Sequence, residues 1–278
     1  MNIVLDTNQA LKIPNASELH AGPASVDRLI LAPYVIAEVL LRSNPEPTLS
    51  HLRTFRVRYG LEPVDVFERV AVLPEREIES FQPFVRQGDT VSSDDFYLAL
   101  KAPIPEQRER ARLVKKENRE FCESMASAAI RFRKKLDDGA NAVRKCSTIS
   151  EALDHAKSFH RDLVFESISN GSQRTLITSD KESLYGAVMR NQYLGRLFRT
   201  LLYYILSWSR LWADQKHNFD PSAGRDDWTD ITLPLYAADG DVIVTEDAQL
   251  RKSIEMIEPT GRVSVKPAAQ LQHYPSPK

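Results

Sequence analysis

Asp230–Asp247 reads DITLPLYAADGDVIVTED, and this stretch decides the fold. Asp230 opens an apolar helical turn, a glycine-containing turn follows, and the β-branched run Val242–Val244 has the composition of a fully buried strand. Thr245 and Asp247 come at the end of that strand. In open α/β sheets, ligands bind outside the carboxyl ends of the parallel strands. We therefore predict a parallel sheet with Asp247 as a candidate site residue.

The amino-terminal residues supply a second strand that ends in an acid. Met1–Leu5 are mostly apolar and stop at Asp6, which small polar residues suited to a turn or a helix cap follow. A third acid, Glu38, lies in Leu29–Arg42, where Pro33 suits the first turn of a helix and the other residues around Glu38 are apolar. An isolated buried carboxylate is strongly disfavoured, so Glu38 needs a partner or a metal.

These motifs together resemble those of the PIN-domain nucleases. That family is similar in its first strand ending Asp-Thr-Asn, in a Glu within a helix after a Pro, in an Asp before an apolar helix, and in a strand ending Thr-x-Asp. The corresponding residues here are Asp6-Thr7-Asn8, Glu38, Asp230 and Thr245-Glu246-Asp247. The segment Arg262–Leu271 resembles the family's last strand and the turn after it. The resemblance covers roughly residues 1–45 and 226–272.

The resemblance implies a three-layer α/β/α domain whose central parallel sheet is formed by both chain ends. We expect residues 1–47 and 226–278 to form this PIN-like core and residues 48–225 to form a mostly helical insertion. Helical periodicity is strongest in Pro105–Leu136, Ser150–Ile168 and Glu182–Trp212, and shorter helical segments are predicted at Thr48–Tyr59 and Glu75–Val85. The apolar stripe of the long helix is predicted to consist of Leu113, Phe121, Met125, Ala128 and Phe132.

Composition fits a soluble globular protein. The chain has 278 residues, 42% hydrophobic and 27% charged, with a formal net charge of -1. Two cysteines, Cys122 and Cys146, indicate a reducing compartment without a disulfide framework, and they lack the spacing of a zinc site. No apolar stretch approaches a membrane span, and Met1 leads into a strand without a basic region or cleavage site, so we expect a cytoplasmic protein that does not contact membranes.

The resemblance implies hydrolysis of phosphodiesters with Mg²⁺ or Mn²⁺, hard cations that favour oxygen ligands. Asp6 and Asp230 would be the principal metal ligands, Glu38 and Asp247 would complete the acidic pocket, and Asn8 and Thr245 would orient carboxylates or water. Close carboxylates repel by about 4 kcal/mol per pair at an effective dielectric of 20, and a bound metal removes that cost.

Each acid also has a purely structural explanation. Asp6 suits a strand-end turn, Asp230 and Asp247 suit helix caps, and Glu38 suits a solvated helix position. Asp227 is an alternative to Asp230 as a ligand, and Asp226 is a further acid nearby, whereas Asp239 and Asp241 flank a glycine and are predicted to be solvated turn residues. Thr178-Ser179-Asp180 imitates the Thr-x-Asp motif, but Ser179–Glu182 is better explained as a capping box.

Cations of the long helix offer a phosphate-binding strip. They form two clusters, Arg108, Arg110, Arg112, Lys115, Lys116 and Arg119, and then Arg131, Arg133, Lys134 and Lys135. Glutamates interleave with the first cluster, so a solvated face of paired charges is the favoured interpretation. Arg196 and Arg199 lie among aromatic residues that could stack on bases, although core packing of those aromatics is favoured.

The predicted function is a divalent-metal-dependent endonuclease whose substrate is RNA, single-stranded RNA in particular, because the family is mainly ribonucleolytic. A toxin-like ribonuclease with an antitoxin or another protein as partner belongs to this hypothesis, although the large insertion departs from compact toxins. The alternative is an inactive PIN-like fold that acts as an RNA-binding or protein-interaction scaffold. The presence of all four acidic positions favours the enzyme.

Overall fold

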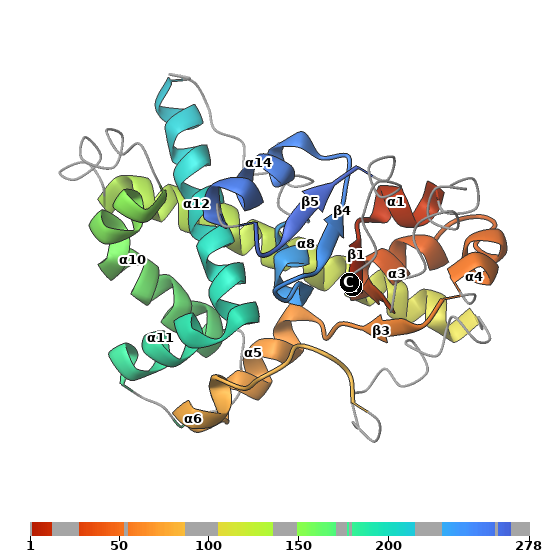
Figure 1. Cartoon of the computed structure of the whole chain (residues 1–278), viewed down its shortest axis with the longest axis horizontal. Helices are drawn as coiled ribbons and strands as arrows, with labels where there is room; N and C mark the ends of the chain where they lie inside the picture. The colour runs from red at the N-terminus through yellow and green to blue at the C-terminus, as the bar shows by residue number, and fades with distance from the viewer. Residues whose placement is uncertain are drawn as a thin grey trace, which may run out of the picture. The chain divides into compact units, whose positions relative to one another are not determined.

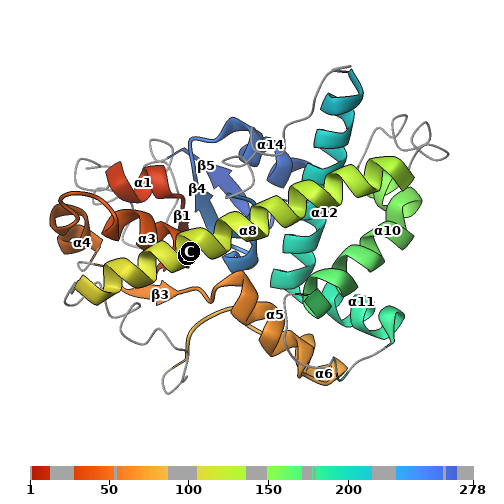
Figure 2. The same cartoon turned by 180° about the vertical axis from the view of Figure 1, so that it is seen from behind.

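The computed structural model describes residues 2–12, 28–52, 55–86, 105–135, 149–170, 177, 180–214, 230–258 and 261–267 (Figures 1 and 2). The chain divides into two compact units. Residues 1–62, 83–118 and 236–278 form the first, which we call the sheet unit. Residues 63–82 and 119–235 form the second, which we call the helical unit.

Five parallel strands form the sheet, so the predicted α/β class with a parallel sheet is confirmed. Their order is β3-β2-β1-β4-β5, and they span Asn2–Leu5 (β1), Arg28–Leu31 (β2), Val57–Tyr59 (β3), Val242–Val244 (β4) and Ser264–Lys266 (β5). The three residues of β4 and the last three residues of β1 are buried, as expected for central strands covered on both faces. The quoted run Val242–Val244 is therefore a central strand beside β1.

The strand order reverses between β1 and β4. From β1 the chain proceeds through β2 to β3 on one side, whereas β4 and β5 extend the sheet on the other side. Leu5 pairs with Val244, so the carboxyl ends of β1 and β4 lie side by side. Such a topological switch point is where open α/β sheets form their ligand-binding crevice.

Four helices accompany the strands of the sheet unit. They are α1 (Thr7–Lys12), α3 (Pro33–Leu40), α4 (Glu46–Leu52) and α14 (Ala248–Ile257). The long helix α8 (Pro105–Lys135) contributes its first part, residues 105–118, to this unit, and in Figure 2 that part runs past α3. All residues of α3 except Glu38 are buried, which explains why this helix is almost entirely apolar.

The prediction of a helix over Thr48–Tyr59 is wrong in its second half. Helix α4 ends at Leu52, and Val57–Tyr59 instead form β3 and pair with Leu29–Leu31 of β2. A β-branched and an aromatic residue favour the strand, and the free edge of β2 supplies the partner. The sheet unit thus includes a strand from within residues 48–225.

The prediction of a helix over Glu75–Val85 is also wrong beyond its first turn. Helix α6 spans Glu75–Ile78 only, and Phe84 forms an antiparallel bridge with Gly60. At this point the Tyr236 hydroxyl donates a 2.6 Å hydrogen bond to the carbonyl of Leu61. A Cβ on Gly60 would lie 2.4 Å from the Tyr236 ring, so this close approach requires glycine.

The predicted long helix is confirmed as α8, but its buried face differs from the predicted stripe. Leu113 is 43% exposed, whereas Ala111, Val114, Phe121 and Met125 are buried. The side chains of Ala128 and Phe132 lie outside the described residues. Buried positions at 107, 111, 114 and 118 follow helical spacing, and residue 113 falls off that face.

The helical unit contains the rest of α8 together with α5 (Pro63–Ala71), α6, α10 (Ile149–Asn170), α11 (Lys181–Arg190) and α12 (Gln192–Asp214). Phe67 is buried in this unit, and its ring centroid lies 6.0 Å from that of Phe121 and 6.2 Å from that of Phe198. None of the helices in the described parts of the chain has the length and apolarity needed to cross a membrane.

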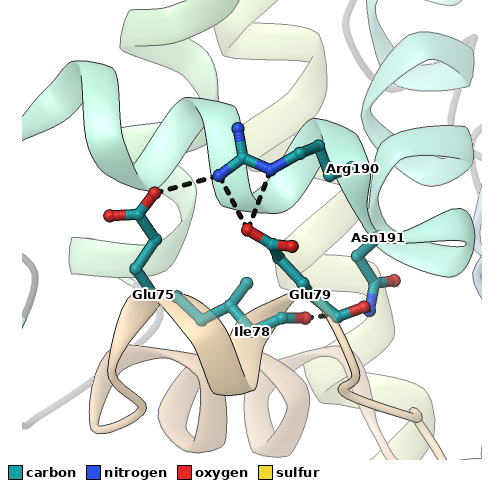
Figure 3. Close-up of polar contacts among 5 residues, drawn as sticks. All are labelled: Glu75, Ile78, Glu79, Arg190 and Asn191. Carbon is teal, nitrogen blue, oxygen red and sulfur yellow. Dashed lines mark hydrogen bonds and ion pairs between the residues drawn. The ribbon is translucent and has the colours of Figure 1, made fainter.

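The predicted helix Glu182–Trp212 is divided at Asn191 into α11 and α12. The Asn191 carboxamide oxygen accepts hydrogen bonds from the backbone N–H groups of Tyr193 and Leu194, so it caps α12. Its Nδ2 donates to the carbonyls of Ile78 and Phe81 at 2.9 and 2.8 Å. One buried side chain therefore joins the α11–α12 corner to the end of α6 (Figure 3).

Candidate acidic site at the switch point

Asp6 occupies the carboxyl end of β1, at the strand-order switch point. Its backbone N–H donates to the Val244 carbonyl at 3.1 Å, and the Thr245 N–H donates to the Lys266 carbonyl at 3.1 Å. Backbone pairing thus continues one residue beyond β1 and β4. This pairing fixes Asp6 next to Thr245, although 239 residues separate them in the sequence.

Thr245 connects the two aspartates of this edge. Its hydroxyl donates a 2.9 Å hydrogen bond to Oδ2 of Asp6, and it accepts a 3.0 Å bond from the backbone N–H of Asp247. Both Thr245 and Asp6 are buried, at 0% and 2% exposure. Because its donor and acceptor roles are both used, the hydroxyl has a defined direction and holds the Asp6 carboxylate in one orientation.

Burial raises the pKa of the Asp6 carboxyl above its ordinary value of 3.8. The hydrogen bond from Thr245 and the backbone N–H groups of Asn8 and Thr7 lower that pKa, and the negative charge of Asp247 raises it further. Thr245 connects the two residues, because its hydroxyl contacts both Oδ2 of Asp6 and the backbone N–H of Asp247. Two acids at one edge of the sheet create a negative potential that a cation would relieve.

Asp247 is also the N-cap of α14. Its Oδ1 accepts hydrogen bonds from the backbone N–H groups of Gln249 and Leu250 at 2.6 and 2.9 Å. The structural explanation for Asp247, a helix cap, is therefore confirmed. It does not exclude a second role, because both of these bonds use the same oxygen and the other oxygen takes part in neither.

Glu38 lies on α3, and its carboxylate is 3.5 Å from the ammonium of Lys115 on α8. The Glu38 side chain is 32% exposed and that of Lys115 is 60% exposed. The partner that an acid on an apolar helix needs is thus a cation from the first basic cluster. The sheet unit contains both residues.

Asp230 begins the 3₁₀ helix η3 (Asp230–Tyr236), which confirms the predicted helical turn after this acid. By residue range, Asp230 belongs to the helical unit, whereas Asp6, Glu38 and Asp247 belong to the sheet unit. Asp226 and Asp227, the latter the alternative ligand, lie outside the described residues.

The prediction that Asp239 and Asp241 are solvated turn residues is right for Asp239 and wrong for Asp241. Asp239 is exposed and lies 3.8 Å from Arg262. Asp241 is 5% exposed and accepts hydrogen bonds from Nδ2 of Asn2 at 3.0 Å and from the Ala238 N–H at 2.9 Å. Parallel pairing of β1 with β4 brings Asn2 next to Asp241, so this aspartate links the amino ends of the two strands.

The predicted helix start at this segment is confirmed, but the N-cap is Asp180, one residue after the first residue of the predicted capping box. The Asp180 carboxylate accepts a 2.7 Å hydrogen bond from the Ser183 N–H at the start of α11. The cap is Asp180, whereas Ser179, which opens the predicted capping box, lies outside the described residues. The hydrogen bonds from Ser183 lower the pKa of Asp180.

The first basic cluster is largely paired within the sheet unit. Arg110 contacts Glu62 at 2.6 Å, Arg112 contacts Glu109 at 2.6 Å, and Arg108 donates to the Arg42 carbonyl at 3.4 Å. This favours the predicted face of paired charges. For the second cluster, Arg131–Lys135, only the helical backbone is described.

Two of the aromatic residues near Arg196 pack in the core, and Tyr203 is half-buried. Arg196 is 1% exposed, and Tyr193 and Phe198 are buried. Burial of these two rings leaves them inaccessible to nucleic-acid bases, which agrees with the favoured interpretation.

Two polar groups in α1 were not singled out from the sequence. The Thr7 hydroxyl and Nε2 of Gln9 are buried and have no hydrogen-bond partner among the described residues. Both follow Asp6 within the first turn of α1.

The oxygen ligands at this edge suit a hard divalent cation. Within the described ranges, no group of three or more His, Cys, Asp or Glu side chains is placed to hold a metal ion. Asp6 and Asp247, which both contact the Thr245 hydroxyl, supply two acidic residues at this edge, and Mg²⁺ is commonly held by one or two carboxylates and several waters. The residues present fit that mode of binding. Comparison with protein-family models, curated proteins and solved structures gave no match.

Proposed function

We propose that this protein is a Mg²⁺- or Mn²⁺-dependent endonuclease with a three-layer PIN-like core that cleaves single-stranded RNA in the cytoplasm. The observation that carries the proposal is the Asp6–Thr245–Asp247 arrangement. At the switch point of a parallel sheet, the buried Thr245 hydroxyl donates to the Asp6 carboxylate and accepts from the backbone N–H of Asp247, so one hydroxyl connects two acidic residues. The choice of RNA as substrate, and of an antitoxin or other protein as partner, depends on the sequence resemblance.

In this mechanism Asp6 and Asp247 would hold the ion, and the sequence resemblance assigns Asp230 and Glu38 to the same acidic set. When bound, Mg²⁺ or Mn²⁺ would supply Lewis-acid chemistry, that is, polarisation of the scissile phosphate and activation of water. Thr245 keeps Oδ2 of Asp6 in a fixed direction, so little reorganisation of this carboxylate is needed on binding. The buried amide of Gln9 and hydroxyl of Thr7 are further hydrogen-bonding groups next to Asp6 in sequence.

A second function, an inactive scaffold for RNA or protein, is favoured by a different observation. Each of the three candidate site acids that belong to the sheet unit has a partner that explains it structurally. Asp6 accepts from Thr245, Asp247 caps α14, and Glu38 contacts Lys115. A scaffold has no need for divalent metal, so metal binding separates the two functions.

The test measures metal binding and cleavage with the same proteins. Calorimetric titration with Mn²⁺ should give binding to the wild type, and Asp6→Asn should remove most of it, because one negative charge and one oxygen ligand are lost. Single-stranded RNA should be cleaved only when Mn²⁺ is present and in preference to structured RNA, and Asp6→Asn should abolish cleavage.

Asp239→Asn is the matched control, since it removes an exposed aspartate of the same unit outside the switch point. It should behave as the wild type does. Absence of Mn²⁺ binding by the wild type would favour the scaffold, and equal losses in the two variants would rule out a specific role for Asp6.

A further inference from the structure

We propose that Arg251 binds a phosphate group of the RNA substrate beside the acidic edge, and that the carbonyl of Thr245 holds its guanidinium in place there. The inference rests on the proposed function, because it supplies the cation that a polyanionic substrate needs next to two acids. Arg251 belongs to α14 and therefore to the same sheet unit as Asp6 and Asp247.

One hydrogen bond places the Arg251 guanidinium at the carboxyl end of β4. Its Nη1 donates to the Thr245 carbonyl at 3.2 Å. The hydroxyl of the same threonine donates to the Asp6 carboxylate at 2.9 Å and accepts from the Asp247 N–H at 3.0 Å. Thr245 thus contacts both acidic residues and the cation, so all three lie at one edge of the sheet.

The helix that carries Arg251 is held against the sheet. Leu250 and Ile254 are completely buried, and the Arg251 N–H donates to the Asp247 carbonyl at 3.1 Å. Helix α14 packs beside β5, which adjoins β4 on the side away from β1 (Figure 1). Since Asp6 follows β1, a nucleic-acid strand that lies along this edge would meet Asp6 first and then the guanidinium.

The guanidinium has donors left for a ligand. An arginine side chain presents five N–H groups in a planar fork, and the Thr245 carbonyl accepts from one nitrogen of that fork. Among the described residues no carboxylate pairs with Arg251, although Asp247 and Glu255 lie one turn before and after it on the chain. Because arginine forks commonly bind phosphate through two hydrogen bonds, a guanidinium held in one direction with most donors uncommitted suits that ligand.

Other arginines of the sheet unit are placed differently. Arg110 and Arg112 each pair with a glutamate at 2.6 Å. Arg262 precedes β5, at the amino ends of the strands, and pairs with an exposed aspartate. Of these arginines, Arg251 is the one that contacts Thr245 at the carboxyl ends, where the acids lie.

The experiment compares Arg251→Met with Arg262→Met, a control that removes an arginine of the same unit from the opposite edge of the sheet. The probe is a single-stranded RNA oligomer, bound in Ca²⁺ at several salt concentrations. Arg251→Met should bind it about tenfold more weakly and lose about 0.7 units of salt-dependence slope, the value for one phosphate contact on a single strand. Arg251→Lys should keep the slope but recover only part of the affinity, because lysine has the charge without the fork.

Calorimetric titration with Mn²⁺ separates phosphate binding from a structural role of the Arg251–Thr245 contact. Loss of a positive charge beside the acids does not weaken their attraction for a cation, so Arg251→Met should bind Mn²⁺ at least as tightly as the wild type does. Arg262→Met should match the wild type with both ligands.

Three results would overturn the inference and leave the proposed function standing, provided that the wild type binds Mn²⁺ and RNA. They are weaker Mn²⁺ binding by Arg251→Met, an unchanged RNA salt slope in that variant, and an equal loss of slope in Arg262→Met. Failure of the wild type to bind Mn²⁺ overturns the proposed function, and this inference with it.

Discussion

Replacing Thr245 with Val tests whether the switch point holds an ionised, oriented carboxylate. Valine matches threonine in shape but has no hydroxyl, so the change removes the 2.9 Å hydrogen bond to Asp6 and the acceptor for the Asp247 N–H. A hydrogen bond to a charged group contributes about 1.5–3 kcal/mol, and the partly buried Asp247 N–H adds up to about 1 kcal/mol. We expect Thr245→Val to lower the free energy of unfolding by about 2–4 kcal/mol at pH 7.5 without metal.

The loss should depend on pH in a defined direction. The folded-state pKa of Asp6 is raised above 3.8, so protonation of Asp6 stabilises the fold, and this gain is complete below pH 3.8. Without the Thr245 hydroxyl the pKa of Asp6 rises further, so the stabilisation by protonation of Asp6 begins at a higher pH. The difference between wild type and variant should therefore be largest near neutral pH and should shrink as Asp6 becomes neutral in both.

The assay is urea unfolding in EDTA at several pH values, with hydrogen exchange of the β4 amides as a local readout for the sheet unit. Thr200→Val is the matched control, because Thr200 is equally buried but donates to the neutral Arg196 carbonyl within α12. It should cost no more than about 1 kcal/mol, independently of pH. In an Asp6→Asn background, Thr245→Val should lower the free energy of unfolding by less than it does in the wild type. Equal costs for the two Thr→Val variants, or a pH-independent loss at position 245, would refute the reasoning.

Two further predictions concern the helical unit. His160 is buried, and its ring nitrogens contact the Tyr185 hydroxyl and the Phe198 carbonyl; burial lowers its pKa from 6.5 to about 4. Between pH 4 and pH 6.5, unfolding therefore takes up a proton at His160. The free energy of unfolding should fall by about 3 kcal/mol from pH 6.5 to pH 4, and His160→Gln should remove this loss in urea unfolding. Asn191→Ala removes a helix cap and buried hydrogen bonds, so it should lower the unfolding free energy by about 2–4 kcal/mol. Arg190→Met, which removes only exposed ion pairs, should cost much less, and a similar cost for both variants would contradict the proposed role of Asn191 (Figure 3).

Several features were predictable from the sequence because their causes are local. Continuous β-branched and apolar runs identified the central strands β1 and β4, and helical periodicity identified α8 almost to the residue. Acids at strand ends follow from the strand pattern alone, so Asp6 and Asp247 were predictable as candidate site residues. The start of α11 was likewise indicated by a short-range pattern, although the residue that caps it is Asp180 and not the first residue of the predicted capping box.

The remaining features depend on contacts between residues far apart in the chain. Whether Val57–Tyr59 form a helix or a strand is decided by the edge of β2, and whether Asp241 is solvated is decided by Asn2 across the sheet. The Lys115–Glu38 contact likewise depends on where α8 packs. The sequence by itself determined which segments are strands or helices wherever a local period was strong, and which acids end strands. Only the tertiary structure decided which strand ends lie together, because the strand order β3-β2-β1-β4-β5 brings Asp6 to Thr245, whose hydroxyl also contacts the backbone N–H of Asp247.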